Sequence, residues 1–150
     1  MREKLFRGKR LDNGAWIESD CITQFEKDFI NGKEESTIKL WDKDGWAYID
    51  KNTFGEFSSL PDKNGKRIFD GDIVRLTPPK ESSEVYVPTP RNPSEDRILQ
   101  VVFFEGIFAV DMRKWVKHGY GRIELRSYET ERIEVIGNIY DNPELLEVDR

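Results

Sequence analysis

The stretch LPDKNGKRIFDGDIVRL, Leu60–Leu76, places two glycines after polar residues and ends in an apolar run. Asn-Gly and Asp-Gly pairs supply the positive φ angle that tight β-turns need. We therefore interpret Gly65 and Gly71 as turn residues on either side of a short strand, with a core strand beginning at Ile73. Two similar stretches predict further turns that lead into strands, LDNGAWI at Leu11–Ile17 and WDKDGWAYI at Trp41–Ile49.

Between such turns, β-branched and aromatic residues gather in short runs that favour strands. The Glu105-Gly106 pair separates two of these runs and predicts a hairpin. Helix signals are scarce: Asn142-Pro143 is typical of a helix start and predicts a helix over 142–148, and a weaker pattern predicts one over Met112–His118. The predicted strands are Ala15–Ile17, Thr37–Trp41, Ala47–Ile49, Ile73–Leu76, Ile98–Phe104, Ile107–Val110, Ile123–Leu125 and Ile133–Tyr140.

The sequence predicts a mostly β protein: a small barrel-like antiparallel β domain with hairpins, a long Pro-rich loop and a few short helices. We expect a single domain over 1–150, with a β-hairpin region at 1–57 and a barrel-like core at 58–140. Five of the seven prolines fall between Thr77 and Arg97. Proline cannot pair in a central strand, and long loops in compact domains are functional or disordered. We interpret 77–97 as a flexible arm.

The composition limits the class of protein. The net charge is −5 and the pI is about 5.1, which argues against a general nucleic-acid binder. One cysteine, Cys21, excludes an internal disulfide and suits a reducing compartment. No apolar leader follows the first ten residues, and the most apolar stretch, Val101–Val110, is too short to span a membrane. We expect a cytoplasmic protein without membrane contact.

The two ends of the chain carry opposite charge. MREKLFRGKR at the start is basic, and DNPELLEVDR at the end is acidic. The ends either pair, within one chain or between copies, or stay solvated. The second interpretation is favoured, because surface ion pairs contribute little to stability.

We considered three kinds of chemical site. A calcium loop beginning at Asp62 would need an oxygen ligand and then a glycine where Lys66 and Arg67 stand, so the pattern fails. Asp70 and Asp72 could form half of an acid–base pair, but a turn that feeds a strand explains them better. One histidine and one cysteine cannot build a typical zinc site, and nothing in the sequence supports a dyad of Cys21 and His118. We predict no catalytic residue, no metal and no cofactor.

A basic and aromatic segment, MRKWVKHGYGR at Met112–Arg122, is the one candidate for nucleic-acid binding. Small β domains can bind single strands by combining aromatic rings with cations. The alternative is amphipathic packing with the charged heads in water. The residues that would bind are Arg113, Lys114, Trp115, Lys117, Tyr120 and Arg122.

Three pieces of the chain resemble the YopX-like family of phage and prophage proteins. They are FRGKRLDNGAWI at Phe6–Ile17, the central stretch Ile49–Arg75, and EVIGNIYDNPELL at Glu134–Leu146, in the family's order and spacing. The central stretch is similar to the family's string Thr-Gly-Leu, Asp-x-Asn-Gly, Glu/Asp-Gly-Asp-Ile-Val. One departure is Ser58-Ser59-Leu60, where the family has Thr-Gly-Leu, so this chain lacks the usual glycine at Ser59.

The resemblance implies a compact, mostly β fold and a phage or prophage origin, and it brings no established activity. The expected protein is a non-enzymatic accessory protein in the cytoplasm of a bacterial host. We expect it to bind a host or phage protein and to form a homo-oligomer, with nucleic acid as the alternative partner. The motif residues are interpreted as structural: Asp62, Asn64, Gly65, Gly71, Asp72, Gly137, Asn138, Tyr140, Asn142 and Pro143.

Overall fold

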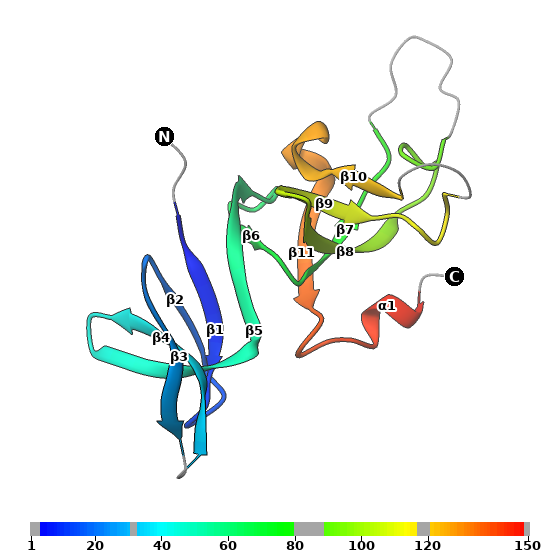
Figure 1. Cartoon of the computed structure of the whole chain (residues 1–150). Coiled ribbons are helices and arrows are strands. Elements are labelled where there is room, and N and C mark those ends of the chain that lie inside the picture. The colour runs from blue at the N-terminus through cyan, green and yellow to red at the C-terminus, as the bar shows by residue number, and fades with distance from the viewer. Residues whose placement is uncertain (1–3, 31–32, 80–88, 117–120, 149–150) are drawn as a thin grey trace. The chain divides into compact units, whose positions relative to one another are not determined.

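A computed structural model describes residues 4–30, 33–79, 89–116 and 121–148. These residues form two antiparallel sheets with few helical turns, and the prediction of a mostly β fold is confirmed (Figure 1). Each sheet is an open series of strands with two outer strands, so neither closes into the barrel that the sequence suggested. The chain divides into two compact units, Met1–Ser59 and Leu60–Arg150. The single-domain description stays a prediction.

The first sheet has the strand order β2-β1-β5-β4-β3, and β6 pairs with β5. A small core of Ile17, Leu40 and Ile49 lies on one of its faces. Gly8 passes directly against Ile49, whose side chain occupies the space that an added Cβ would need. The strands are β1 (Phe6–Arg10), β2 (Trp16–Ser19), β3 (Cys21–Ile30), β4 (Lys33–Asp42), β5 (Gly45–Pro61) and β6 (Arg67–Phe69).

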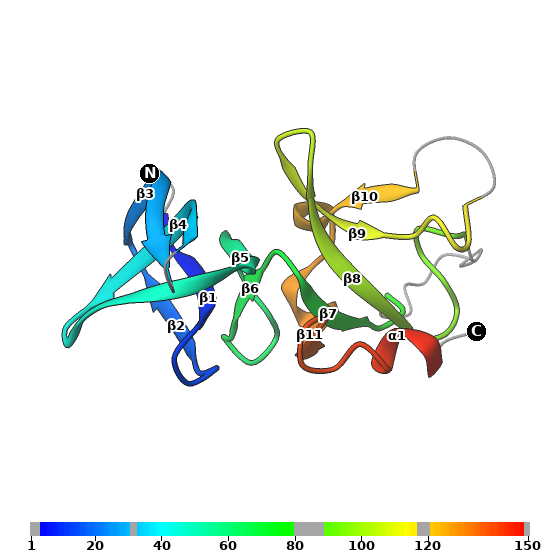
Figure 2. The same cartoon turned by 60° about the horizontal axis from the view of Figure 1, so that its bottom comes forward.

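The second sheet has the order β10-β9-β8-β7-β11 (Figure 2). It carries the larger core, with Val74, Leu99 and Val101 on adjacent strands fully buried. Its strands are β7 (Asp72–Leu76), β8 (Arg97–Phe104), β9 (Ile107–Asp111), β10 (Arg122–Glu124) and β11 (Ile133–Asn138), joined by two 3-10 turns, η1 (Leu125–Ser127) and η2 (Thr130–Arg132), and followed by α1 (Leu145–Val148).

Every predicted strand overlaps an observed one, and the hairpin between β8 and β9 is confirmed. Glu105 and Gly106 have φ angles of 49° and 82°, the positive pair that a two-residue hairpin turn of this kind requires. The short strand expected between Gly65 and Gly71 is observed as β6, and two strands escaped prediction, β1 and β3. The sequence of β1, FRGKR, is short and cationic, so it does not show the alternation that identifies a strand.

Two helix predictions need correction. Residues 142–144 do not belong to the C-terminal helix, which begins at Leu145, because the Asn142 side-chain oxygen accepts the N–H of Asn138 in the preceding turn. In Met112–His118, the described residues as far as Val116 form a turn, in which Met112 O accepts two N–H groups, and not a helix.

The described ends of the Pro-rich segment are held by hydrogen bonds. Thr77 N–H donates to Arg132 O, and the Arg132 guanidinium donates back to Thr77 O and to the side chain of Asn92. The Tyr128 hydroxyl donates to Arg91 O at 2.8 Å. Residues 80–88 lie outside the described residues, so the flexible arm stays a prediction there.

Candidate functional site

Asp62, the acidic residue of the first turn, forms hydrogen bonds with backbone N–H groups. The residue is 3% exposed, and its carboxylate accepts three N–H groups, from Asn64 at 2.8 Å, Lys66 at 2.9 Å and Val135 at 2.9 Å. Gly65 in the same turn has a φ angle of 80°. The carboxylate therefore closes the turn and ties it to β11.

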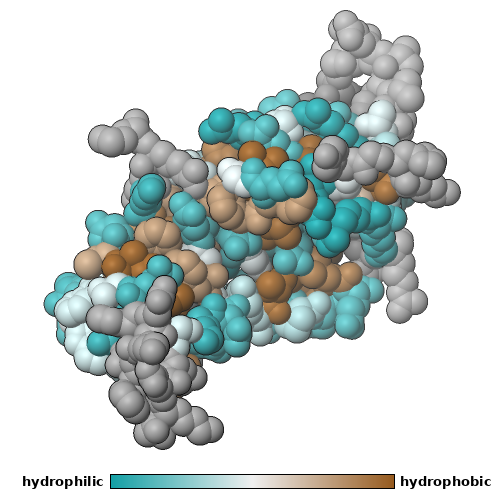
Figure 3. All heavy atoms as spheres, viewed as in Figure 1, coloured by the Kyte–Doolittle hydropathy of each residue, from teal (hydrophilic) through white to brown (hydrophobic). Residues whose placement is uncertain are grey.

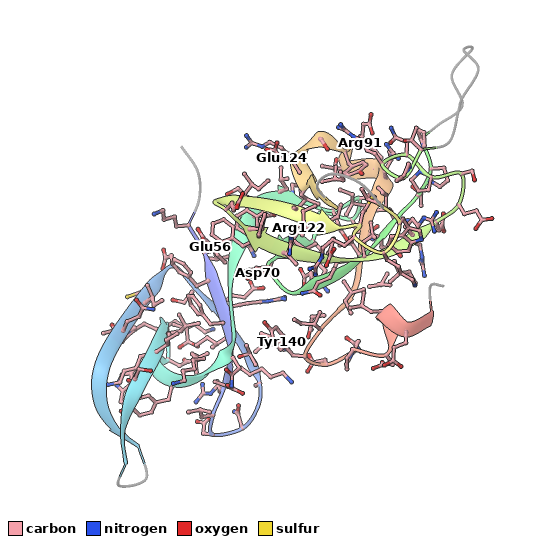
Figure 4. All side chains as sticks on the ribbon, turned by 45° about the vertical axis from the view of Figure 1, so that its right-hand side comes forward. Glu56, Asp70, Arg91, Arg122, Glu124 and Tyr140 are labelled. Carbon is pink, nitrogen blue, oxygen red and sulfur yellow. The ribbon has the colours of Figure 1, made fainter. Side chains whose placement is uncertain are left out.

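The second turn is built in the same way. The Asp72 carboxylate is buried and accepts the N–H of Phe69 at 2.8 Å. Gly71 has a φ angle of 90°, donates to Val101 O and accepts from Ile139 N. A Cβ at Gly71 would lie 3.0 Å from the Tyr140 ring, so glycine is needed here for space as well as for conformation. Figure 4 shows where Asp70 and Tyr140 lie on the ribbon.

The C-terminal motif forms a third compact turn. The Asn138 side-chain oxygen accepts the N–H groups of Tyr140 and Asp141 at 3.0 and 2.9 Å. A Cβ at Gly137 would lie 2.6 Å from the Asn142 side-chain oxygen. Pro143 follows Asn142 and its carbonyl accepts the N–H of Leu146. The contacts of all three turns hold the backbone, and we keep the structural role of the motif residues as our interpretation.

A groove beside Trp115 brings together part of the predicted basic and aromatic set. The cavity has a volume of about 410 Å³, and Arg113, Lys114 and Trp115 line it. Ile98, Leu99 and Leu146 are the apolar residues among those that line it. We call it the Trp115 groove. Arg122 does not line it: the Arg122 guanidinium lies 3.9 Å from the ring centroid of Phe104 (Figure 4). Lys117 and Tyr120 lie outside the described residues.

Two cations cover the Trp115 ring. The Arg97 guanidinium lies 4.6 Å from the ring centroid and the Lys114 ammonium lies 5.2 Å from it. Arg97 is the first residue of β8, and Lys114 and Trp115 belong to the turn after β9. The start of β8 and the end of β9 therefore lie beside each other near this ring. Arg97 was missed by the sequence analysis because it lies fifteen or more positions away from the basic segment, and only the register of the sheet brings it close.

Among the described residues that line the Trp115 groove, Asp111 provides the one acidic side chain. Its carboxylate accepts two hydrogen bonds from the Arg113 guanidinium, at 2.9 and 2.8 Å. This hydrogen bonding lowers the pKa of Asp111 and raises the pKa of Arg113. The pair is therefore fully ionised at neutral pH and neutralises itself, which leaves Lys114 as the remaining cation among the described residues that line the groove.

A model of the YopX protein family matches residues 5–147. This chain belongs to the YopX family. A curated relative of the same family is the SPbeta prophage-derived uncharacterized protein YopX of Bacillus subtilis, 39% identical over 84 residues. That match covers 55% of this chain and 52% of the relative, so the chain spans about half the length of the curated relative that it matches.

Two solved structures share the fold of this YopX-family chain. The crystal structure of Bacillus subtilis YopX matches with a TM-score of 0.52 and 24% identity, over 95% of this chain and 97% of that one. The crystal structure of an Enterococcus faecalis protein matches with a TM-score of 0.50 and 20% identity, over 97% and 99% of the two chains. At this level of identity, both likenesses speak for the fold alone.

Within the described ranges of the YopX-family chain, no group of three His, Cys, Asp or Glu side chains is placed to hold a metal ion. No helix in that part of the chain is long and apolar enough to cross a membrane. The remaining conspicuous features are exposed aromatic and aliphatic side chains. Trp41, Trp46 and Tyr48 form a row of ring contacts on β4 and β5, and Phe103 and Ile107 are exposed on the β8–β9 hairpin.

Proposed function

We propose that this YopX-family chain is a prophage-encoded accessory protein that acts by binding a protein partner and copies of itself, without catalysis. The name of the Bacillus subtilis relative supports the prophage origin. The single cysteine supports a reducing compartment, the cytoplasm of the bacterial host.

The observation that carries the binding role is the exposed apolar end of the β8–β9 hairpin. Phe103 is 45% exposed and Ile107 is 39% exposed, although both belong to the paired strands β8 and β9. Phe103 packs on Phe108 with ring centroids 4.7 Å apart, which holds it in place. Apolar residues reach the surface among hydrophilic ones in Figure 3. Rigid exposed aromatic groups of this kind are typical centres of protein–protein interfaces.

The test is the molar mass in solution. We expect light scattering coupled to size exclusion to give a mass above that of one chain at micromolar concentration, falling on dilution. The double variant Phe103→Ser, Ile107→Ser should shift the protein to monomer. Leu11→Ser, which removes an apolar side chain that is still more exposed from another turn, is the control and should leave the mass unchanged. A monomer at every concentration would refute the self-association.

Single-stranded nucleic acid is the second candidate partner, and the covering of Trp115 by Arg97 and Lys114 favours it. Aromatic rings beside cations bind bases and phosphates without sequence preference. Binding should weaken steeply as salt rises, because each phosphate contact releases a counterion. Removing Arg113, Lys114 and Lys117 together should abolish it. Unchanged affinity in that triple variant would reject this surface.

A further inference from the structure

Asparagine followed by glycine is a reactive pair as well as a turn signal. The backbone nitrogen of the glycine can attack the side-chain carbonyl of the asparagine, because glycine has no side chain to obstruct the approach. The sequence holds three such pairs, Asn13-Gly14, Asn31-Gly32 and Asn64-Gly65. The structure describes the first and the third, and it places their asparagines in different surroundings.

The Asn13 side chain is folded back over its own glycine. Its Oδ1 accepts the N–H of Ala15 at 2.9 Å, and this hydrogen bond closes a ring that contains the Gly14 nitrogen. The hydrogen bond also polarises the side-chain carbonyl, as the donor in an oxyanion hole does. Residues 11–15 are all exposed, so water and hydroxide reach the pair. The two reacting groups are therefore held together in one exposed turn.

The Asn64 side chain is tied to a neighbouring strand instead. It donates a hydrogen bond to the Glu134 carboxylate on β11. The hydrogen bonds that close this turn, to the N–H groups of Asn64 and Lys66, are accepted by Asp62 and not by the Asn64 side chain. A carboxylate beside the amide also opposes the negative charge that develops on the side-chain oxygen during attack. Both glycine N–H groups donate to a backbone carbonyl, at 2.9 and 3.0 Å, so that feature does not separate the two sites.

We propose that Asn13 is a site of spontaneous covalent modification, converted to aspartate and isoaspartate in the folded protein, where Asn64 is protected. Hydroxide takes the proton of the Gly14 N–H, and the nitrogen forms a bond to the Asn13 Cγ. The bond from Cγ to Nδ2 breaks, and the amide nitrogen takes a proton from water and leaves as ammonia. Water then opens the five-membered imide. Attack at Cγ restores the ordinary backbone as aspartate, and attack at the backbone carbonyl gives isoaspartate. In total, one water is consumed and one ammonia is released.

The modification changes the charge and the shape of the turn between β1 and β2. Either product adds one negative charge at neutral pH to a chain whose net charge is −5. The new carboxylate is next in the chain to Asp12, which pairs with Arg10. Isoaspartate also lengthens the backbone by one atom, in a turn that hydrogen bonds from Arg10 to Ala15 and from Gly14 to Arg10 close. This inference concerns neither of the binding surfaces proposed above.

The experiment is incubation of the full chain in mildly alkaline buffer, with and without urea at a denaturing concentration. Cleavage after glutamate then places Asn13 and Asn64 in separate peptides, and mass spectrometry measures the conversion of each amide to the acid. In the folded chain we expect Asn13 to convert at least about tenfold faster than Asn64. In urea the two rates should converge, because the hydrogen bonds that distinguish the sites are lost.

Gly14→Ala should slow the conversion of Asn13 by at least about tenfold, because the added Cβ obstructs the attack. Gly65→Ala is the matched control and should leave the rate at Asn13 unchanged: an added Cβ has no neighbour within 4 Å at either glycine, and their φ angles are 71° and 80°. Circular dichroism first confirms that both variants are folded. Equal rates at Asn13 and Asn64 in the folded chain would overturn the inference. So would a difference of about tenfold that persists in urea, since the local sequence and not the fold would then select the site.

Discussion

Ser59 has a backbone conformation that residues with a side chain rarely adopt. Its φ angle is 69°, in the left-handed region where a side chain costs free energy and glycine does not. The family string that this chain resembles has glycine at this position. We expect Ser59→Gly to raise the free energy of unfolding by about 0.5–1 kcal/mol, since relief of the strain outweighs the extra freedom of the unfolded chain. Urea or guanidinium unfolding measures the change.

The neighbouring residue is the matched control. Ser58 is buried in the same strand and does not have a positive φ angle. Ser58→Gly should therefore lower the free energy of unfolding by about 0.5–1 kcal/mol, the usual cost of glycine in a strand. Two shifts of the same sign would contradict the explanation from the φ angle.

The Asp62 carboxylate is the acceptor of three backbone hydrogen bonds. Removing this carboxylate leaves three backbone N–H groups, of Asn64, Lys66 and Val135, without their acceptor. We expect Asp62→Ala to lower the free energy of unfolding by about 3 kcal/mol, because buried donors that lose a charged acceptor pay a desolvation penalty. Asp42→Ala is the control: its exposed carboxylate accepts one N–H, from Asp44. A similar loss of unfolding free energy in Asp62→Ala and Asp42→Ala would show that the three buried hydrogen bonds of Asp62 add no stability.

At the scale of elements, Tyr128 joins the segment around Arg91 to the second sheet. Burial raises its pKa to about 12, and its hydroxyl donates to Arg91 O at 2.8 Å. The folded protein thus favours the neutral phenol. Its contribution to stability is complete below the unfolded pKa of about 10 and is lost as the pH rises from there through 12.

Absorbance at 295 nm follows this ionisation. In the intact protein, one of the five tyrosines should ionise near pH 12. Tyr128→Phe should remove that late step, and the variant should lose less stability than the parent between pH 10 and 12. Tyr48→Phe, a change in the first sheet, is the control. If the late step persists in Tyr128→Phe, the assignment is wrong.

The turns could be read from the sequence, whereas the groove could not. Asn-Gly and Glu-Gly pairs have a local requirement for positive φ, which is why Gly65 and the β8–β9 hairpin were predicted correctly. The Trp115 groove depends on pairing between distant strands, so Arg97 and Leu146 carried no signal beside the basic segment. The start of α1 was misplaced because the side chain of Asn142 serves the preceding turn.

At the scale of the whole molecule, the chain has two cores without a residue in common. One is built on Leu40 and its neighbours, all before Ser59, and the other on Val74 and its neighbours, all after it. The long strand β5 runs through the boundary as far as Pro61. Each core therefore stabilises its own unit, while the continuous strand gives a route by which loss of one unit could affect the other.

Leu40→Ala tests whether the two units unfold separately, as their separate cores suggest, or together through the continuous strand β5. Leu40 is fully buried, so the change should cost about 2–5 kcal/mol. We expect hydrogen exchange followed by mass spectrometry to accelerate in peptides from residues 4–58 and to stay slow in peptides from β7 to β9, because their packing is separate. Val74→Ala, at an equally buried site in the other core, should give the reverse pattern. Acceleration throughout the chain in both variants would instead mean that the two units unfold together, as one domain.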